Sequence, residues 1–189
     1  MMVTKKKGLN MEYLPLIVLN AVLIISAVTD LRYQKIPNIV TLPAALAALA
    51  YHTKINGLEG FLFSATGLAA GIALLILPYL MGGMGAGDAK LLGVVGAFIG
   101  PKQVFYAFLI IAIIGGIYAM LLMFFQRSSF KGFFRDQYDS LMNVVLTQKL
   151  TPGPGLTDQR RPKLCYGLAI ASGTGLYTIL NLTGHNPFV

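Results

Sequence analysis

Two aspartates stand at the edges of long apolar stretches, where a carboxylate can do proton chemistry. Asp30 follows the apolar run 14–28, and Asp88 precedes the apolar run 91–100. An ionisable group at the end of a membrane helix is costly in free energy, so its presence there indicates a function. Two carboxylates held close together share a proton, which leaves one as a base and the other as an acid. We therefore expect Asp30 and Asp88 to form one catalytic pair.

Each aspartate also has a purely structural interpretation. Asp88 follows a glycine-rich segment and precedes an apolar run, which is typical of a helix N-cap that satisfies free backbone N–H groups. Asp30 lies at the negative end of a helix dipole, where Arg32 and Lys35 are near enough in sequence to neutralise it. The joint occurrence of both aspartates favours the catalytic interpretation.

The composition indicates an integral membrane protein. Of the 189 residues, 56% are hydrophobic and 12% are charged, and the mean hydropathy is +0.69. We expect an all-α, polytopic membrane protein with about six transmembrane helices in a single domain, residues 1–189, and a polar cytoplasmic loop over about 126–163. The apolar runs are 14–28, 39–51, 61–80, 91–100, 104–125 and 164–182.

The order of the runs predicts where the two aspartates lie. Six helices in succession place the end of the first and the start of the fourth on one membrane face, so Asp30 and Asp88 share that face. Ten of the fifteen basic residues fall on that face, which makes it cytoplasmic by the positive-inside rule. The cluster Lys5–Lys7 falls on the opposite face. A start at Met11 would remove that conflict. The competing interpretation is that Lys5–Lys7 and the run 14–28 form a cleaved signal peptide, although no A-x-A cleavage site precedes Asp30.

Several classes of protein are disfavoured. A single cysteine, Cys165, forms no internal disulfide and no four-ligand zinc site, and two histidines, His52 and His185, are a poor basis for a metal site. The net charge of +8 is placed between apolar runs, which suits anionic lipid headgroups rather than nucleic acid. We expect no metal, no cofactor and no nucleic acid.

Two segments resemble the type IV prepilin peptidases, membrane aspartic proteases of the GxGD kind. The sequence GAGDAKL of residues 85–91 is similar to that family's GxGDxKL motif, and Asp30 with the IPN of residues 36–38 is similar to its first motif. Tyr166 and Gly167 give a weaker third match, with Cys165 where the family often has proline. The presenilin and signal peptide peptidase relatives share GxGD, but their other motifs are not found here.

The resemblance implies an activity and a set of site residues. Asp30 and Asp88 would be the catalytic dyad that activates water, without a metal or an acyl-enzyme. The substrate would be a prepilin, cut after the glycine of its short basic leader at the cytoplasmic face of the inner membrane. Residues implied to bind substrate or support the site are Gly85, Gly87, Lys90, Pro37, Asn38, Tyr166 and Gly167.

The subtype also follows from the resemblance. The longer members carry paired CxxC motifs that accompany N-methylation, and those motifs are not in this sequence. The chain therefore resembles the short, peptidase-only forms of tight-adherence (Flp-type) pilus systems, and also the archaeal preflagellin peptidases. Its expected partners are a prepilin and membrane lipids.

Two other classes of function remain open. A small transporter or channel would use Asp30 and Asp88 as ion or proton ligands. A structural membrane subunit would use its glycines for helix packing alone. Pairs with small-xxx-small spacing, which permit close helix approach in lipid, are Gly67/Gly71, Gly83/Gly87 and Gly96/Gly100.

Overall fold

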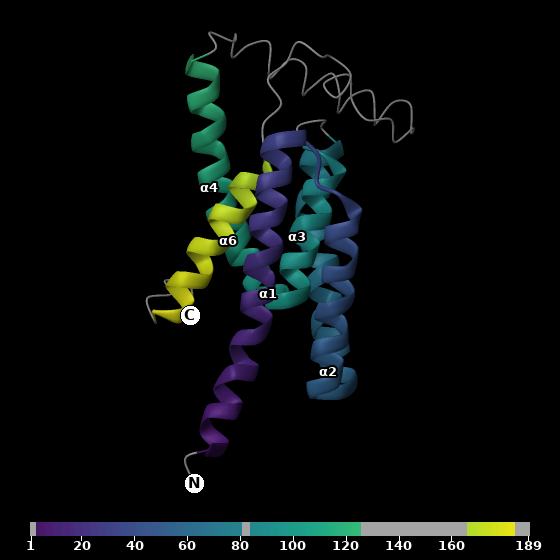
Figure 1. The fold of residues 1–189 in the computed structure, drawn as a ribbon. Helices are drawn as coiled ribbons and strands as arrows, with labels where there is room; N and C mark the ends of the chain where they lie inside the picture. The colour runs from purple at the N-terminus through teal and green to yellow at the C-terminus, as the bar shows by residue number, and fades with distance from the viewer. Residues whose placement is uncertain (1–2, 81–83, 126–165, 184–189) are drawn as a thin grey trace.

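The computed structural model describes residues 3–80, 84–125 and 166–183, and these residues form helices only (Figure 1). This confirms the expected all-α class. The predicted polar loop over 126–163 lies outside the described residues, as do Gly83 and Cys165. The helices are α1 (Val3–Tyr33), α2 (Asn38–Leu80), α3 (Ala86–Ile99), α4 (Pro101–Phe125) and α6 (Tyr166–Leu182).

Helix α2 is a hairpin of two helical arms. Gly57 has φ 59° and ψ −135°, a backbone conformation that a residue with a side chain rarely adopts, and the chain reverses there. Beyond the turn, Gly60 lies directly against the backbone carbonyl of His52, where a side chain would collide. The two arms lie side by side in Figure 1. They correspond to the separate apolar runs 39–51 and 61–80 of the sequence.

Within the described residues, three stretches are long and apolar enough to cross a membrane: Leu14–Tyr33, Asn38–Leu80, which contains both arms of α2, and Pro101–Leu121. Helix α3 has 14 residues, about 21 Å, and α6 has 17 residues, about 26 Å, so each is shorter than the roughly 30 Å hydrocarbon core. The expectation of membrane helices is confirmed, whereas the number of six spans stays a prediction.

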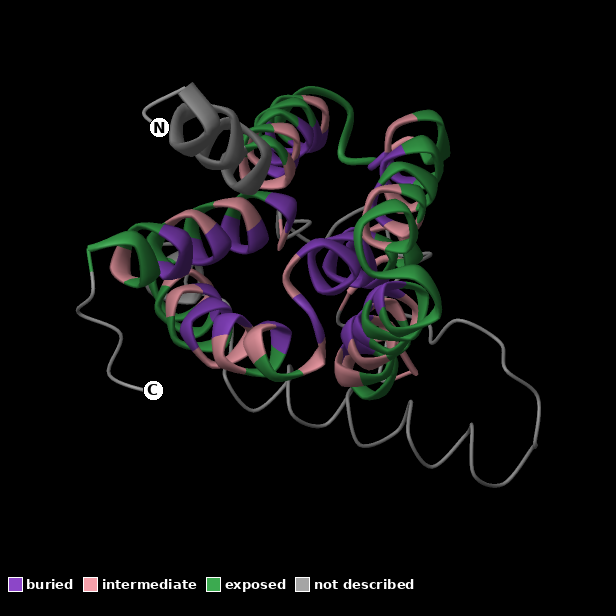
Figure 2. Ribbon diagram, turned by 90° about the horizontal axis from the view of Figure 1, so that it is seen from below, coloured by how far each residue is buried: buried purple, intermediate pink, exposed green. Residues whose placement is uncertain are grey.

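Helix α3 occupies the centre of the assembly. Every residue from Leu91 to Phe98 is buried, because this helix is apolar on all sides and packs against all the other described helices. The outward faces of the surrounding helices carry exposed apolar side chains, such as Ile24, Leu42 and Ile113. Figure 2 shows the buried residues facing inward and the exposed residues facing outward. This distribution suits a protein whose solvent is lipid.

Glycines set the close approach of α2 and α3. A Cβ on Gly67 would collide with the carbonyl of Gly96, a Cβ on Gly96 would collide with that of Gly67, and a Cβ on Gly71 would collide with the carbonyl of Leu92. Ser64 adds a hydrogen bond from its Oγ to the Ala97 carbonyl oxygen, 2.9 Å long. The packing role that the spacing predicts is confirmed for these glycines.

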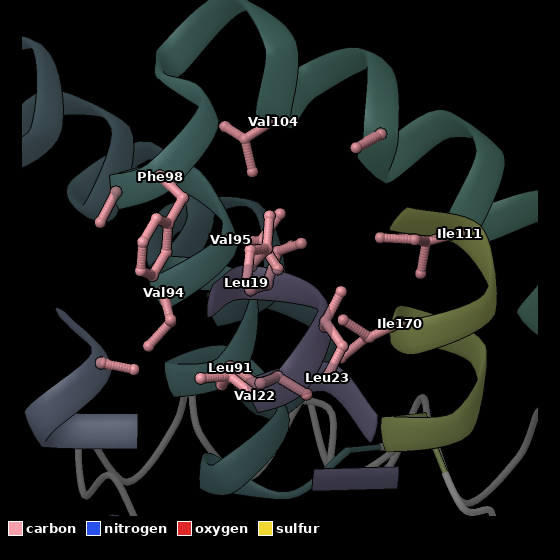
Figure 3. Close-up of a cluster of buried hydrophobic side chains, with 14 of the residues drawn as sticks. Leu19, Val22, Leu23, Leu91, Val94, Val95, Phe98, Val104, Ile111 and Ile170 are labelled. Atoms are coloured by element: carbon pink, nitrogen blue, oxygen red, sulfur yellow. The ribbon is translucent and has the colours of Figure 1, made fainter. Parts of the chain in front are cut away.

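The core joins α3 to α1 and α6. Figure 3 shows Leu19 and Leu23 of α1 beside Val95 of α3 and Ile170 of α6. All four side chains are almost fully buried. This contact fixes α1 and α6 against the central helix.

Substitution of Gly96 by alanine tests the glycine contact. Because the added methyl group would meet backbone rather than a flexible side chain, we expect destabilisation by about 1–3 kcal/mol, seen as a lower melting temperature in detergent. The matched control is Gly116→Ala, since a Cβ at Gly116 meets nothing within 4 Å. Equal melting temperatures for the two variants would contradict the close approach.

Candidate active site

The two aspartates lie at the same end of the helical assembly. Asp30 is in the last turn of α1 and Asp88 is in the first turn of α3, and Figure 1 shows these two helix ends together. Both carboxyl groups are buried, with residue exposures of 6% for Asp30 and 8% for Asp88. The structure therefore places at one end of the assembly the two residues that the order of the apolar runs predicts to share a membrane face.

Asp88 is held by the backbone at the start of its own helix. The Gly85 N–H donates to Asp88 Oδ2 over 3.0 Å, and the Asp88 N–H donates to the Gly85 carbonyl oxygen over 3.1 Å. Gly85 is the N-cap and Asp88 is the third helical residue, so the N-cap interpretation of Asp88 is wrong in position. Its carboxylate still satisfies a backbone donor of the cap, and the helix dipole favours a negative charge there.

Asp30 is held by a different helix. The Gly167 N–H, at the N-terminus of α6, donates to Asp30 Oδ2 over 2.9 Å. A Cβ on Gly167 would lie 2.8 Å from that oxygen, so only glycine lets the backbone come so close. Asp30 sits at the unfavourable end of the α1 dipole, and the N-terminus of α6 offsets this. Gly167, from the weakest of the three sequence matches, thus contacts Asp30 of the first motif.

The chain turns sharply between α1 and α2. The Gln34 N–H donates to the Asp30 carbonyl oxygen over 2.8 Å, and Gln34 has a φ of 51°, which ends α1. The Pro37 carbonyl oxygen then accepts from the Val40 N–H over 3.1 Å as α2 begins. Pro37 therefore has a local role at the start of α2.

This turn is in contact with the start of α3. Ile36 is buried against Gly87, where a Cβ would lie 3.0 Å from Ile36 Cβ. Lys90 Nζ donates to Asn38 Oδ1 over 2.9 Å, although both side chains are exposed. The IPN segment and the GxGDxKL segment thus form one surface. The sequence does not predict the partner of Lys90, because 52 residues separate it from Asn38.

The carboxyl group of Asp88 is tuned by its surroundings. Asp88 precedes the apolar stretch of α3 and lies outside the three candidate spans. Burial raises its pKa to about 6, the Asp30 charge also raises it, and the hydrogen bond from Gly85 opposes the change. Burial raises the pKa of the Tyr166 phenol, and the charge of Asp88 raises it further; the Tyr166 ring lies near Gly115 of α4. Nothing in the sequence around Gly115 predicts that it lies beside Tyr166.

These features allow acid–base chemistry at the end of the bundle. With a pKa of about 6, Asp88 changes its protonation state near neutral pH, and it does so in the field of a second carboxylate. In the part of the chain that the structure describes, no group of three His, Cys, Asp or Glu side chains is arranged to hold a metal ion.

The fold and the site define an all-helical membrane protein with two buried aspartates at one end. The sequence profile of the type IV leader peptidase family matches residues 17–120, which is more than half of the chain and includes both aspartates. The protein belongs to the type IV leader peptidase family.

The chain is also similar in sequence to a curated protein. The chain is 36% identical over 113 residues to the prepilin leader peptidase/N-methyltransferase of Bacillus subtilis (strain 168). The match covers 59% of this chain and 45% of the relative, so the chain spans less than half of that protein's length. No solved structure matches the chain significantly.

The raised pKa of Asp88 predicts a pH dependence of stability. The folded protein holds the proton to about pH 6, whereas the unfolded chain releases it near pH 4, so stability falls as the pH rises through this window. At pH 7.5 we expect Asp88→Asn to be more stable than wild type, by at most about 3 kcal/mol. Thermal unfolding at pH 4 and pH 7.5 measures this. A wild-type difference between the two pH values that Asp88→Asn leaves unchanged would contradict it.

Proposed function

We propose that this protein is an aspartic endopeptidase that removes the short basic leader from type IV, Flp-like prepilins. It cuts after the leader's glycine at the cytoplasmic face of the inner membrane and does not methylate the product. The observation that carries the proposal is the pair of buried carboxylates, Asp30 and Asp88, each held by a backbone N–H at one end of the bundle.

The pair supplies both halves of peptide hydrolysis. The ionised aspartate takes a proton from a water molecule, whose oxygen attacks the carbonyl carbon of the scissile bond. The protonated aspartate hydrogen-bonds the carbonyl oxygen and neutralises its developing charge. The C–N bond then breaks as the leaving nitrogen accepts a proton from the dyad. The products are a carboxylic acid and an amine, and the dyad again holds one shared proton.

The remaining site residues have supporting roles. Gly85 and Gly167 donate the hydrogen bonds that orient the two carboxylates. Lys90 and Asn38 tie the start of α3 to the start of α2, and Pro37 and Gly87 complete the same surface. Tyr166 places its phenol within the field of Asp88.

The location of the site suits a substrate anchored in the membrane. A prepilin has a polar leader followed by an apolar helix, so its scissile bond lies at the membrane surface. The exposed cations Arg32 and Lys35 follow Asp30 directly, and anionic headgroups attract such residues. The scissile bond and the two aspartates thereby lie at the same depth, at the membrane surface.

Replacing either aspartate with asparagine tests the dyad. Because Asn neither takes nor gives the catalytic proton, Asp30→Asn and Asp88→Asn should each lower prepilin cleavage about a hundredfold or more. The measurement is a gel-shift assay in membranes with a co-expressed Flp-like prepilin. Glu59→Gln is the matched control, because Glu59 is an exposed carboxylate near the hairpin turn of α2, and it should cleave normally.

The same assay separates the alternatives. Processing by both aspartate variants at the wild-type rate would refute the dyad. Cleavage of an archaeal preflagellin in preference to the Flp-like prepilin would make the protein a preflagellin peptidase. If wild type leaves both substrates intact, the transporter and the structural subunit become the better explanations. The mass of the mature pilin reports methylation directly, and an added methyl group would contradict that part of the proposal.

Gly167→Ala tests the hydrogen bond that positions Asp30. The added methyl group would lie too close to Asp30 Oδ2, so the carboxylate must move and cleavage should fall about tenfold or more. Gly175→Ala is the control on the same helix, since a Cβ there meets nothing within 4 Å. Equal rates for the two variants would show that the Gly167 contact does not position the dyad.

A further inference from the structure

Two hydroxyl groups in the core have no hydrogen-bond partner. Ser26 of α1 and Thr174 of α6 are both 0% exposed, and neither Oγ nor Oγ1 is bonded to any part of the chain that the structure describes. Two other buried hydroxyls are satisfied: Thr178 donates to the Thr174 carbonyl oxygen and Ser64 donates to the Ala97 carbonyl oxygen. An unpaired buried hydroxyl lowers stability, so two of them call for an explanation.

The two hydroxyls lie on the surfaces by which α1 and α6 face each other. The Asp30–Gly167 hydrogen bond fixes these faces. Ser26 is one helical turn before Asp30, and Thr174 is two turns after Gly167, so each falls on the same stripe of its helix as the bonded residue. Ser26 is thus about 6 Å and Thr174 about 10 Å along its helix from that bond, toward the middle of the bundle.

A peptide substrate can supply the hydrogen-bond partners that these two hydroxyls lack. A protease must hold the chain extended next to the scissile bond, and the helix that follows begins with four N–H groups that have no partner within the helix. In a membrane environment such groups need protein partners. A Ser or Thr hydroxyl can donate to a carbonyl and accept from an N–H, so it suits either kind of peptide group.

We propose that α1 and α6 part on the side of the Asp30–Gly167 hydrogen bond that faces the middle of the bundle, which admits the substrate, and that Ser26 and Thr174 then hydrogen-bond its main chain just beyond the scissile bond. This inference rests on the proposed peptidase function. The two hydroxyls are unpaired in the closed state and paired in the substrate complex, so their burial favours opening of the α1–α6 contact. The part of the contact that opens is formed by apolar side chains such as Leu23 and Ile170, while the Asp30–Gly167 hydrogen bond stays closed and keeps Asp30 oriented.

Removing the hydroxyls should separate stability from activity. Thr174→Val keeps the shape of the side chain, and Ser26→Ala removes only the oxygen. Because an unpaired buried hydroxyl is lost, each variant should melt about 2–4 °C above wild type. Because a hydrogen bond to substrate is also lost, kcat/KM for prepilin cleavage should fall roughly three- to tenfold.

Matched controls have the same side chains with hydrogen bonds already formed. Thr178→Val lies one turn from Thr174, and Ser64→Ala lies between α2 and α3. Both should melt at or below the wild-type temperature and should leave kcat/KM unchanged, because their hydroxyls are already paired within the protein.

Each outcome of this comparison is decisive. Higher melting temperatures with lower kcat/KM for Thr174→Val and Ser26→Ala would support the proposal. Lower melting temperatures would overturn it, since the hydroxyls would then be paired in the resting protein. Higher melting temperatures with unchanged kcat/KM would also overturn it, since the substrate would not use them. Failure of wild type to cleave would refute the peptidase function itself. That result is distinct from the outcomes above, in which wild type cleaves.

Discussion

Burial of two carboxylates at one end of an apolar helical assembly is the constraint on which the site depends. Each carboxylate needs a donor that remains with it inside the protein, and in both cases a glycine N–H provides one: Gly85 for Asp88 and Gly167 for Asp30. The first donor is local, whereas the second comes from the last described helix. Both carboxylates therefore have their donors only when α1, α3 and α6 are assembled together.

The central position of α3 has a related physical cause. Its length of 14 residues cannot span the hydrocarbon core alone, so the surrounding helices must bury it. Gly67 and Gly96 let α2 and α3 touch backbone to backbone, and Leu91 and Val95 fill the opposite side. Because α3 is short, it also starts within the assembly. Its first turn, which carries Asp88, therefore lies at the edge of the apolar region.

Much of this arrangement could be predicted from the sequence. The apolar runs predict the helices. Their order places Asp30 and Asp88 at one end, because successive membrane helices run in opposite directions. The separate runs 39–51 and 61–80 predict the reversal that the chain makes at Gly57. The sequence did not predict the Lys90–Asn38 hydrogen bond or the unpaired Ser26 and Thr174 hydroxyls. These depend on the side-chain directions and the register between helices far apart in sequence, which local patterns do not encode.

Titration of Asp88 in the presence and absence of the Asp30 charge tests most directly whether the two aspartates act as one coupled pair. The measurement is carbon-13 NMR of labelled aspartate carboxyl groups in detergent-solubilised wild type and Asp30→Asn. Because the Asp30 charge contributes to the raised pKa of Asp88, we expect a lower Asp88 pKa in the variant. An Asp88 pKa that is the same in both proteins would contradict the pair.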